Sequence, residues 1–163
     1  MMLALTLSVV LNAETLEGQW RAITLEPGEL RSFRVPRLET VTAGSGVCIE
    51  EGLVGDAPET VSLKATCGGV RTTMAWKKGG ERVHIMACAE ADDRPAPVLA
   101  LRKTVQGELK VLKSKALTAC VRNGRVELWG WSASPDEAAK LTALEKKYGL
   151  EKVRSFVEPL PEP

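Results

Sequence analysis

The order of apolar and polar residues divides the chain into two halves with different periods. From Gln19 to Glu90, short segments of β-type composition follow one another with turn residues between them, and no amphipathic helix of three turns appears. This half is predicted to be a small all-β sandwich. Its expected strands before the last hairpin are 20–25, 30–35, 38–42, 46–49 and 60–65.

The last hairpin of this half joins two runs of β-type composition, 72–76 and 82–87. The linker is Lys77-Lys78-Gly79-Gly80, and its glycines suit a tight reversal. Cys67 and Cys88 are expected just outside the two ends of the hairpin. The hairpin gathers no catalytic groups, so we interpret it as scaffold.

A proline-containing segment, 91–97, is the predicted domain linker, because proline lacks the N–H that a sheet ladder requires. After it the apolar residues recur at spacings of three and four, which predicts an amphipathic helix. The predicted apolar stripe is Val98, Leu101, Val105, Leu109 and Leu112.

Asn123-Gly124 predicts a second hairpin, because both residues accept a positive φ. A two-residue loop there would place Thr118 opposite Trp129 and would put Trp129 and Trp131 on one face with Cys120. A face with two tryptophans is expected to be covered, either by the first half or by a partner. Thr118, Trp129 and Trp131 are therefore the candidate interface residues.

Ser134-Pro135-Asp136-Glu137 is a capping box with proline at the first helical position, and Gly149 is expected to end the helix that it starts. A last strand follows at 150–157. The predicted fold class is α+β, with a β domain at 14–90, an α-β-β-α-β domain at 98–158, and a tail at 159–163 that has little reason to fold.

The first residues, Met1 to Leu11, are apolar without interruption and are followed by Asn12-Ala13-Glu14. This is typical of the core and small-residue end of a secretory signal, although no Lys or Arg precedes the run. The run is shorter than the roughly 20 residues that span a bilayer as a helix. We expect residues 1–13 to be a signal peptide and the protein to be periplasmic or secreted; the alternative is a buried first strand.

The chain has four cysteines and one histidine, His84, and no Cys-x-x-Cys pair, so disulfides fit better than a metal site. Spacing favours Cys48 with Cys67 and Cys88 with Cys120, but four cysteines allow three pairings and the sequence does not choose among them. If Cys88 bonds Cys120, the last strand of the first half must lie against the tryptophan face.

Charge is nearly balanced, with 22 Lys and Arg against 21 Asp and Glu, so no broad attraction to nucleic acid or to an anionic membrane is expected. Basic residues nevertheless gather in the second half. They are expected to form a solvated face or to contact lipid headgroups or an acidic partner. The candidate patch is Lys110, Lys113, Lys115, Arg122 and Arg125.

Candidate catalytic groups are few. His84 lies in a predicted strand without a Cys or Ser nucleophile at a recognisable spacing. Strand neighbours point to opposite faces, so Glu50-Glu51 and Asp92-Asp93 are poorly placed as acid and base and are expected to be solvated. We predict no catalytic residues, no cofactor and no metal site, and therefore a protein that is not an enzyme.

The first half resembles the N-terminal domain of secretins from Tad-type pili and related type II and type III secretion systems. The resemblance rests on Leu25-Glu26-Pro27-Gly28-Glu29, Phe33-Arg34-Val35-Pro36-Arg37, Gly69, Thr72-Thr73-Met74-Ala75-Trp76 and Gly80. The second half looks like a BON domain, which follows the first in those secretins, and Leu128-Trp129-Gly130 fits the Leu-x-Gly step of that family.

The resemblance implies a non-enzymatic assembly or adaptor component of a secretin-based pilus or secretion system in the periplasm. It would act through edge strands and the tryptophan face, with machine subunits, a second copy of itself or a membrane surface as partners. The printed chain ends before the ring and pore modules of secretins, so we do not expect it to form the pore. A BON-type phospholipid-binding envelope protein is the alternative that the resemblance permits.

Overall fold

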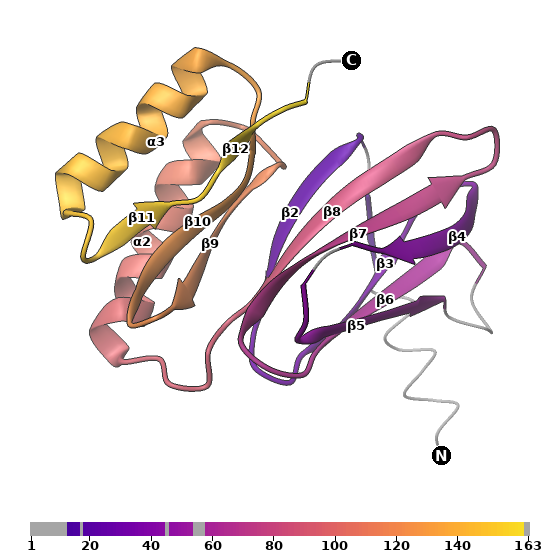
Figure 1. Cartoon of the computed structure of the whole chain (residues 1–163), viewed down its shortest axis with the longest axis horizontal. Coiled ribbons are helices and arrows are strands. Elements are labelled where there is room, and N and C mark those ends of the chain that lie inside the picture. Colours follow the sequence, from indigo (N-terminus) through magenta and orange to yellow (C-terminus); the bar gives the residue numbers. More distant parts are fainter. Residues whose placement is uncertain (1–12, 17, 45, 54–57, 162–163) are drawn as a thin grey trace.

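The computed structural model describes residues 13–16, 18–44, 46–53 and 58–161, which form a mixed α and β structure (Figure 1). The predicted signal peptide, 1–13, lies outside the described residues except for Ala13. Within the described ranges there are two helices and 12 strands. Neither of these helices is long and apolar enough to cross a membrane.

The first half forms two four-stranded sheets. In spatial order, the first sheet contains β1 (Glu14–Thr15), β3 (Leu30–Arg34), β6 (Thr60–Ala65) and β5 (Ile49–Leu53). The second contains β2 (Trp20–Leu25), β8 (Arg82–Ala89), β7 (Gly69–Lys77) and β4 (Leu38–Ala43).

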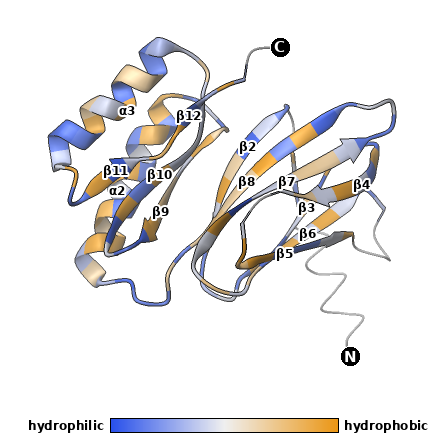
Figure 2. Ribbon diagram, in the orientation of Figure 1, coloured by the Kyte–Doolittle hydropathy of each residue, from blue (hydrophilic) through white to orange (hydrophobic). Residues whose placement is uncertain are grey.

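One apolar core lies between these two sheets. Phe33 and Leu63 from the first sheet and Leu25 and Ile85 from the second are fully buried in the same cluster. Apolar and polar residues alternate along many of the strands (Figure 2), as expected when one face of a sheet packs on a core and the other meets water. The predicted sandwich therefore has the expected two-layer core.

Two strand boundaries differ from the prediction. The strand expected at 46–49 is instead β5 at Ile49–Leu53, because Cys48 has a φ of 75° and cannot continue an extended strand. Cys88 lies inside β8, opposite Val70, rather than beyond the end of the hairpin. The hairpin is longer than predicted, so Cys88 lies within a sheet strand and not in the segment that follows it.

The second half has the predicted order of helix, strand, strand, helix, strand. The β9–β10 pair is antiparallel and β11 runs parallel to β10. Both helices pack on the same face of this sheet (Figure 1). The elements are α2 (Ala96–Val111), β9 (Leu117–Arg122), β10 (Arg125–Ser132), α3 (Pro135–Tyr148) and β11 (Val153–Ser155).

The helical stripe predicted for the first helix is confirmed. Val105 and Leu109 are buried in the core of the second half, and Val98, Leu101 and Leu112 pack against it. On α3, Leu141, Leu144 and Tyr148 pack in this core, whereas Ala138 is exposed.

The hairpin at Asn123-Gly124 is also confirmed. Asn123 has a φ of 54° and Gly124 a φ of 71°, and the register pairs Thr118 with Trp129 as predicted. The helix cap is confirmed as well, since the Ser134 hydroxyl accepts a hydrogen bond from the Glu137 N–H at 3.2 Å.

Two boundaries in this half were predicted wrongly. Helix α2 begins at Ala96, inside the predicted linker, because a proline in the first helical turn loses no hydrogen bond. The last strand is shorter than predicted, and β12 (Glu158–Pro159) spans the predicted boundary between the second domain and the tail. Pro159 lacks an N–H, but the Leu160 N–H donates to the Ser132 carbonyl at 3.0 Å and holds this segment beside β10.

Candidate functional site at the domain junction

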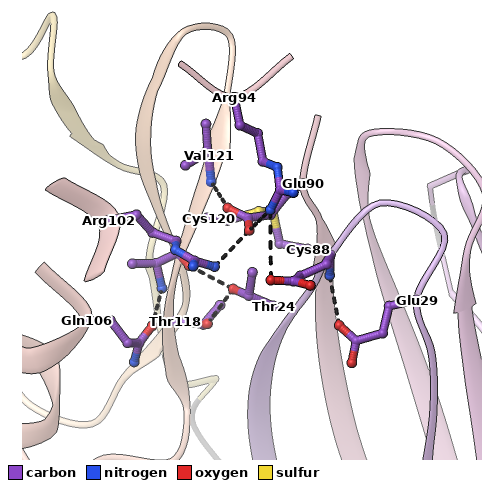
Figure 3. A network of polar contacts seen from close by, with 12 residues as sticks. Thr24, Glu29, Cys88, Glu90, Arg94, Arg102, Gln106, Thr118, Cys120 and Val121 are labelled. Atoms are coloured by element: carbon purple, nitrogen blue, oxygen red, sulfur yellow. Dashed lines mark hydrogen bonds and ion pairs between the residues drawn. A yellow bond between two sulfur atoms is a disulfide. The ribbon is translucent and has the colours of Figure 1, made fainter. Parts of the chain in front are cut away.

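The two halves are joined by a covalent bond and by a set of direct hydrogen bonds. Cys88 and Cys120 form a disulfide across the junction, with a Cα–Cα distance of 6.3 Å. Next to it, the hydroxyls of Thr24 and Thr118 are 2.6 Å apart, and Thr24 Oγ1 also donates to the Ala119 carbonyl at 2.8 Å (Figure 3). Thr118, a predicted interface residue, is therefore buried between the domains.

The first domain covers one of the two tryptophans of this face, Trp131. Trp131 is 6% exposed and contacts the edge of Trp20, with ring centroids 4.8 Å apart. Trp20 in turn stacks on His84 at 4.1 Å. Trp129 is half-buried and stacks on Phe156 at 4.8 Å. Of the two alternatives left open by the sequence, the contact between domains is the one observed for Trp131.

His84 is part of this aromatic stack. Burial, and secondly the nearby charge of Arg82, lower the pKa of His84 below its ordinary value. A neutral imidazole is the form that stacks on an indole without a desolvation cost. This position serves packing at the junction.

The second disulfide, Cys48–Cys67, lies within the first domain. Both pairs are the ones that the spacing favoured. Two disulfides within one chain are consistent with an exported protein in an oxidising compartment.

A buried carboxylate organises the junction, and the sequence analysis missed it. The Glu90 side chain is 0% exposed and lies directly after β8. Its Oε1 accepts hydrogen bonds from Arg102 at 2.7 Å and from Arg94 at 3.2 Å, and its Oε2 accepts the Val121 N–H at 2.7 Å (Figure 3). Glu90 therefore ties the end of the first domain to α2 and β9 through charge-assisted hydrogen bonds.

The same contacts close the outer edge of β9. Gln106 accepts the Ala119 N–H at 3.0 Å, Glu90 accepts the Val121 N–H, and the Ala91 N–H donates to the Val121 carbonyl at 3.1 Å. An edge with its polar groups satisfied is a poor template for another strand. β9 is therefore not one of the edge strands through which a partner could add.

A cleft of about 990 Å³ opens at this junction. Its walls are β2 and Arg31 from the first domain and the C-terminal part of α2 with the start of β9 from the second. The lining includes seven cationic side chains and one carboxylate, Glu14. The cations are Arg21, Arg31, Arg102, Lys103, Lys110, Lys113 and Lys115.

The predicted basic patch is divided by the fold. Lys110, Lys113 and Lys115 line the cleft, but Arg122 and Arg125 do not. These two arginines pair instead with the buried carboxylate of Glu127, at 3.1 and 3.6 Å. The two arginines leave the patch because the turn at 123–124 places both of them on the face of the hairpin that carries Trp129.

The cleft also contains Arg21, which the sequence analysis did not single out. Its side chain is 9% exposed and forms an ion pair with Glu14. Its Nε has no hydrogen-bond partner among the described residues. The signal in the sequence was its position, because Arg21 shares the alternation of Ile23 and Leu25, which face the core.

The adjacent carboxylates are not equivalent. Asp92 and Asp93 are exposed or nearly so, as predicted, and so is Glu50. Glu51 departs from the prediction, because it accepts a hydrogen bond from Arg71 Nη2 at 3.1 Å and is largely covered. Glu51 therefore has a structural ion-pair role.

Within the ranges that the structure describes, no three His, Cys, Asp or Glu side chains gather as a metal site would require. No protein-family model, curated protein or solved structure matches this chain. Function is therefore inferred from the geometry of the junction and of the surfaces around it.

Proposed function

We propose that the protein is an exported, non-enzymatic assembly or adaptor component of a secretin-based pilus or secretion machine. The sequence resemblance motivates the choice of machine, and the helix, strand, strand, helix, strand order supports a BON-like second domain. The two disulfides support an oxidising compartment such as the periplasm.

The observation that carries the proposal is the fixed junction between the domains. The disulfide Cys88–Cys120 and the contacts of Glu90 connect the two sheets into one body. A component that holds its binding surfaces in a preset arrangement loses less conformational entropy when it assembles with partners. This property suits an adaptor better than a pair of domains on a flexible linker.

The partner surface that we assign is the end of the first sheet at β5. Among the described strands, β5 pairs only with β6, so its other edge is available to accept a strand from a partner. Two exposed apolar residues lie at the two ends of this strand: Val47, 71% exposed, just before it, and Leu53, 52% exposed, as its last residue. Apolar anchors beside a free edge are the requirements of strand addition.

The test is affinity purification of the tagged protein from the envelope of its native cell under oxidising conditions. We expect a secretin or pilus subunit to co-purify with the wild type and to be lost with Val47→Asp/Leu53→Asp. Leu150→Asp is a control, because Leu150 is also an exposed apolar residue, at 60%, but lies just beyond the C-terminal end of α3 in the second domain. Recovery of no envelope-machine subunit, or equal recovery with both variants, would contradict the proposal.

A further inference from the structure

We propose that the basic cleft between the domains is a binding site for a compact polyanion that carries two or more phosphate groups. The cleft is formed by both domains, so the ligand would contact β2 on one side and α2 on the other. This inference concerns a surface remote from the β5 edge and does not depend on the identity of any protein partner.

The lining of the cleft carries an excess of positive charge. Two of the seven cations are neutralised by buried or half-buried carboxylates, Arg31 by Glu29 at 2.7 Å and Arg102 by Glu90 at 2.7 Å. Arg21 forms an ion pair with Glu14, the one carboxylate in the lining. Within the described part of the chain, the four lysines form no ion pair; they are Lys103, Lys110, Lys113 and Lys115. Several unpaired like charges around one cleft attract an anion and repel one another without it.

One hydrogen-bond donor of Arg21 is unsatisfied among the described residues. A buried N–H without an acceptor is costly, and such groups call for a specific explanation. The Nε of Arg21 is buried, lacks a partner among the described residues and belongs to a side chain that lines the cleft. A guanidinium presents its N–H groups in a planar fork that matches two oxygens of a phosphate, and Arg21 would offer this fork to a ligand when its side chain turns from Glu14 toward the cleft.

The cleft volume of about 990 Å³ lies at the upper end of the range for small-molecule sites. The four lysines without a carboxylate partner exceed what a single monophosphate can neutralise. A compact molecule with several phosphates matches both the volume and the charge.

The test is isothermal titration calorimetry of the full oxidised chain with inorganic tripolyphosphate at low ionic strength. We expect binding by the wild type, weakened at least about tenfold by Lys110→Gln/Lys115→Gln, because each charge-assisted hydrogen bond contributes about that factor or more. Arg21→Gln should weaken binding similarly. Lys64→Gln/Lys146→Gln removes the same charge from exposed positions outside the cleft and should leave the affinity within about twofold.

A gain of function provides a test that does not depend on weakening the fold. Glu14→Gln removes the carboxylate that competes for Arg21, so tripolyphosphate should bind more tightly. A structural ion pair without a ligand role would give no increase.

Two further probes distinguish the source of the phosphates. Vesicles of phosphatidylglycerol, compared with phosphatidylcholine, report a lipid headgroup; if they bind through the same lysines and tripolyphosphate competes, the phosphates belong to a lipid. If only tripolyphosphate binds, the ligand is a soluble molecule. The proposal is overturned if tripolyphosphate does not bind, if the control double variant weakens binding as much as the cleft variants, or if only a poly-glutamate peptide binds.

Discussion

The junction makes a quantitative prediction at Glu90. Replacement by alanine removes the acceptor for Arg102 and for the Val121 N–H, both at 2.7 Å, and for Arg94 at 3.2 Å. Breaking a buried ion pair costs about 3–5 kcal/mol, and leaving a buried N–H unsatisfied costs about 1–3 kcal/mol. Because the Arg94 and Arg102 side chains are 22% and 16% exposed, water re-solvates part of their charge. We therefore expect Glu90→Ala to lower the free energy of unfolding by about 4 kcal/mol.

Glu90→Gln separates the hydrogen bond from the charge. The amide oxygen still accepts the Val121 N–H, while both arginines lose their counter-charge, so we expect a loss of about 2 kcal/mol. The assay is guanidinium unfolding of the oxidised protein, followed by the fluorescence of Trp20 and Trp131 at the junction. Asp93→Ala is the control, because Asp93 is an exposed acid in the same segment.

The reasoning is refuted if Glu90→Ala costs less than about 1 kcal/mol, which is the level of a surface ion pair. It is also refuted if Glu90→Gln costs as much as Glu90→Ala, because the retained acceptor would then have no value. Either result would mean that the disulfide and the threonine contacts hold the junction without the carboxylate.

Three other predictions concern single groups. Burial, and then the charge of Arg82, lower the pKa of His84 below 6.5. Protonation therefore favours the unfolded chain, and the free energy of unfolding should fall as pH drops from 6.5 through the pKa of the folded state. An NMR titration should show that Arg82→Gln reverses only part of the pKa shift, and a pKa of 6.5 or above in the wild type would contradict this. The hydrogen bond to Glu108 is the largest cause that raises the pKa of Tyr148 above 10.0. Tyr148 is the single tyrosine of the chain, so ultraviolet titration should show its pKa falling in Glu108→Gln. An unchanged pKa would exclude the contact. Lys113 has a φ of 55°, a conformation that glycine adopts without strain. Lys113→Gly should therefore raise the free energy of unfolding by about 1 kcal/mol in denaturant titrations while weakening tripolyphosphate binding. A loss of both stability and tripolyphosphate affinity would indicate that Lys113 has only a structural role.

Local rules explain which predictions were confirmed. The Asn123-Gly124 hairpin needs two residues that accept positive φ, and its loop length sets the register by which Thr118 faces Trp129. The stripe on α2 follows from spacings of three and four. Ser134 caps α3 by accepting the N–H of Glu137, three residues further on. Each of these features is decided by residues a few positions apart.

The boundaries that were predicted wrongly also have local causes. In each case the same residue type is compatible with two different local structures. The prolines of 91–97 were interpreted as a linker, whereas the first turn of a helix tolerates proline equally well. Cys48 was placed in a strand, but its positive φ puts it in a turn before β5. In both cases the same residue type fits two structures, and the packing of the neighbouring segment decides between them.

The sequence by itself determined the two halves, most of their elements and the expectation that a face with two tryptophans is covered; it favoured one set of disulfide pairs but left three pairings open, and the structure chose among them. Only the tertiary structure decided that the first domain covers Trp131, that Glu90 is the buried acceptor at the junction, and that Arg21 and Lys110 line one cleft. The physical reason is range. Turn chemistry and periodicity act between near neighbours, whereas Thr24 and Thr118 meet across 94 positions, and the packing of two folded sheets alone brings such residues together.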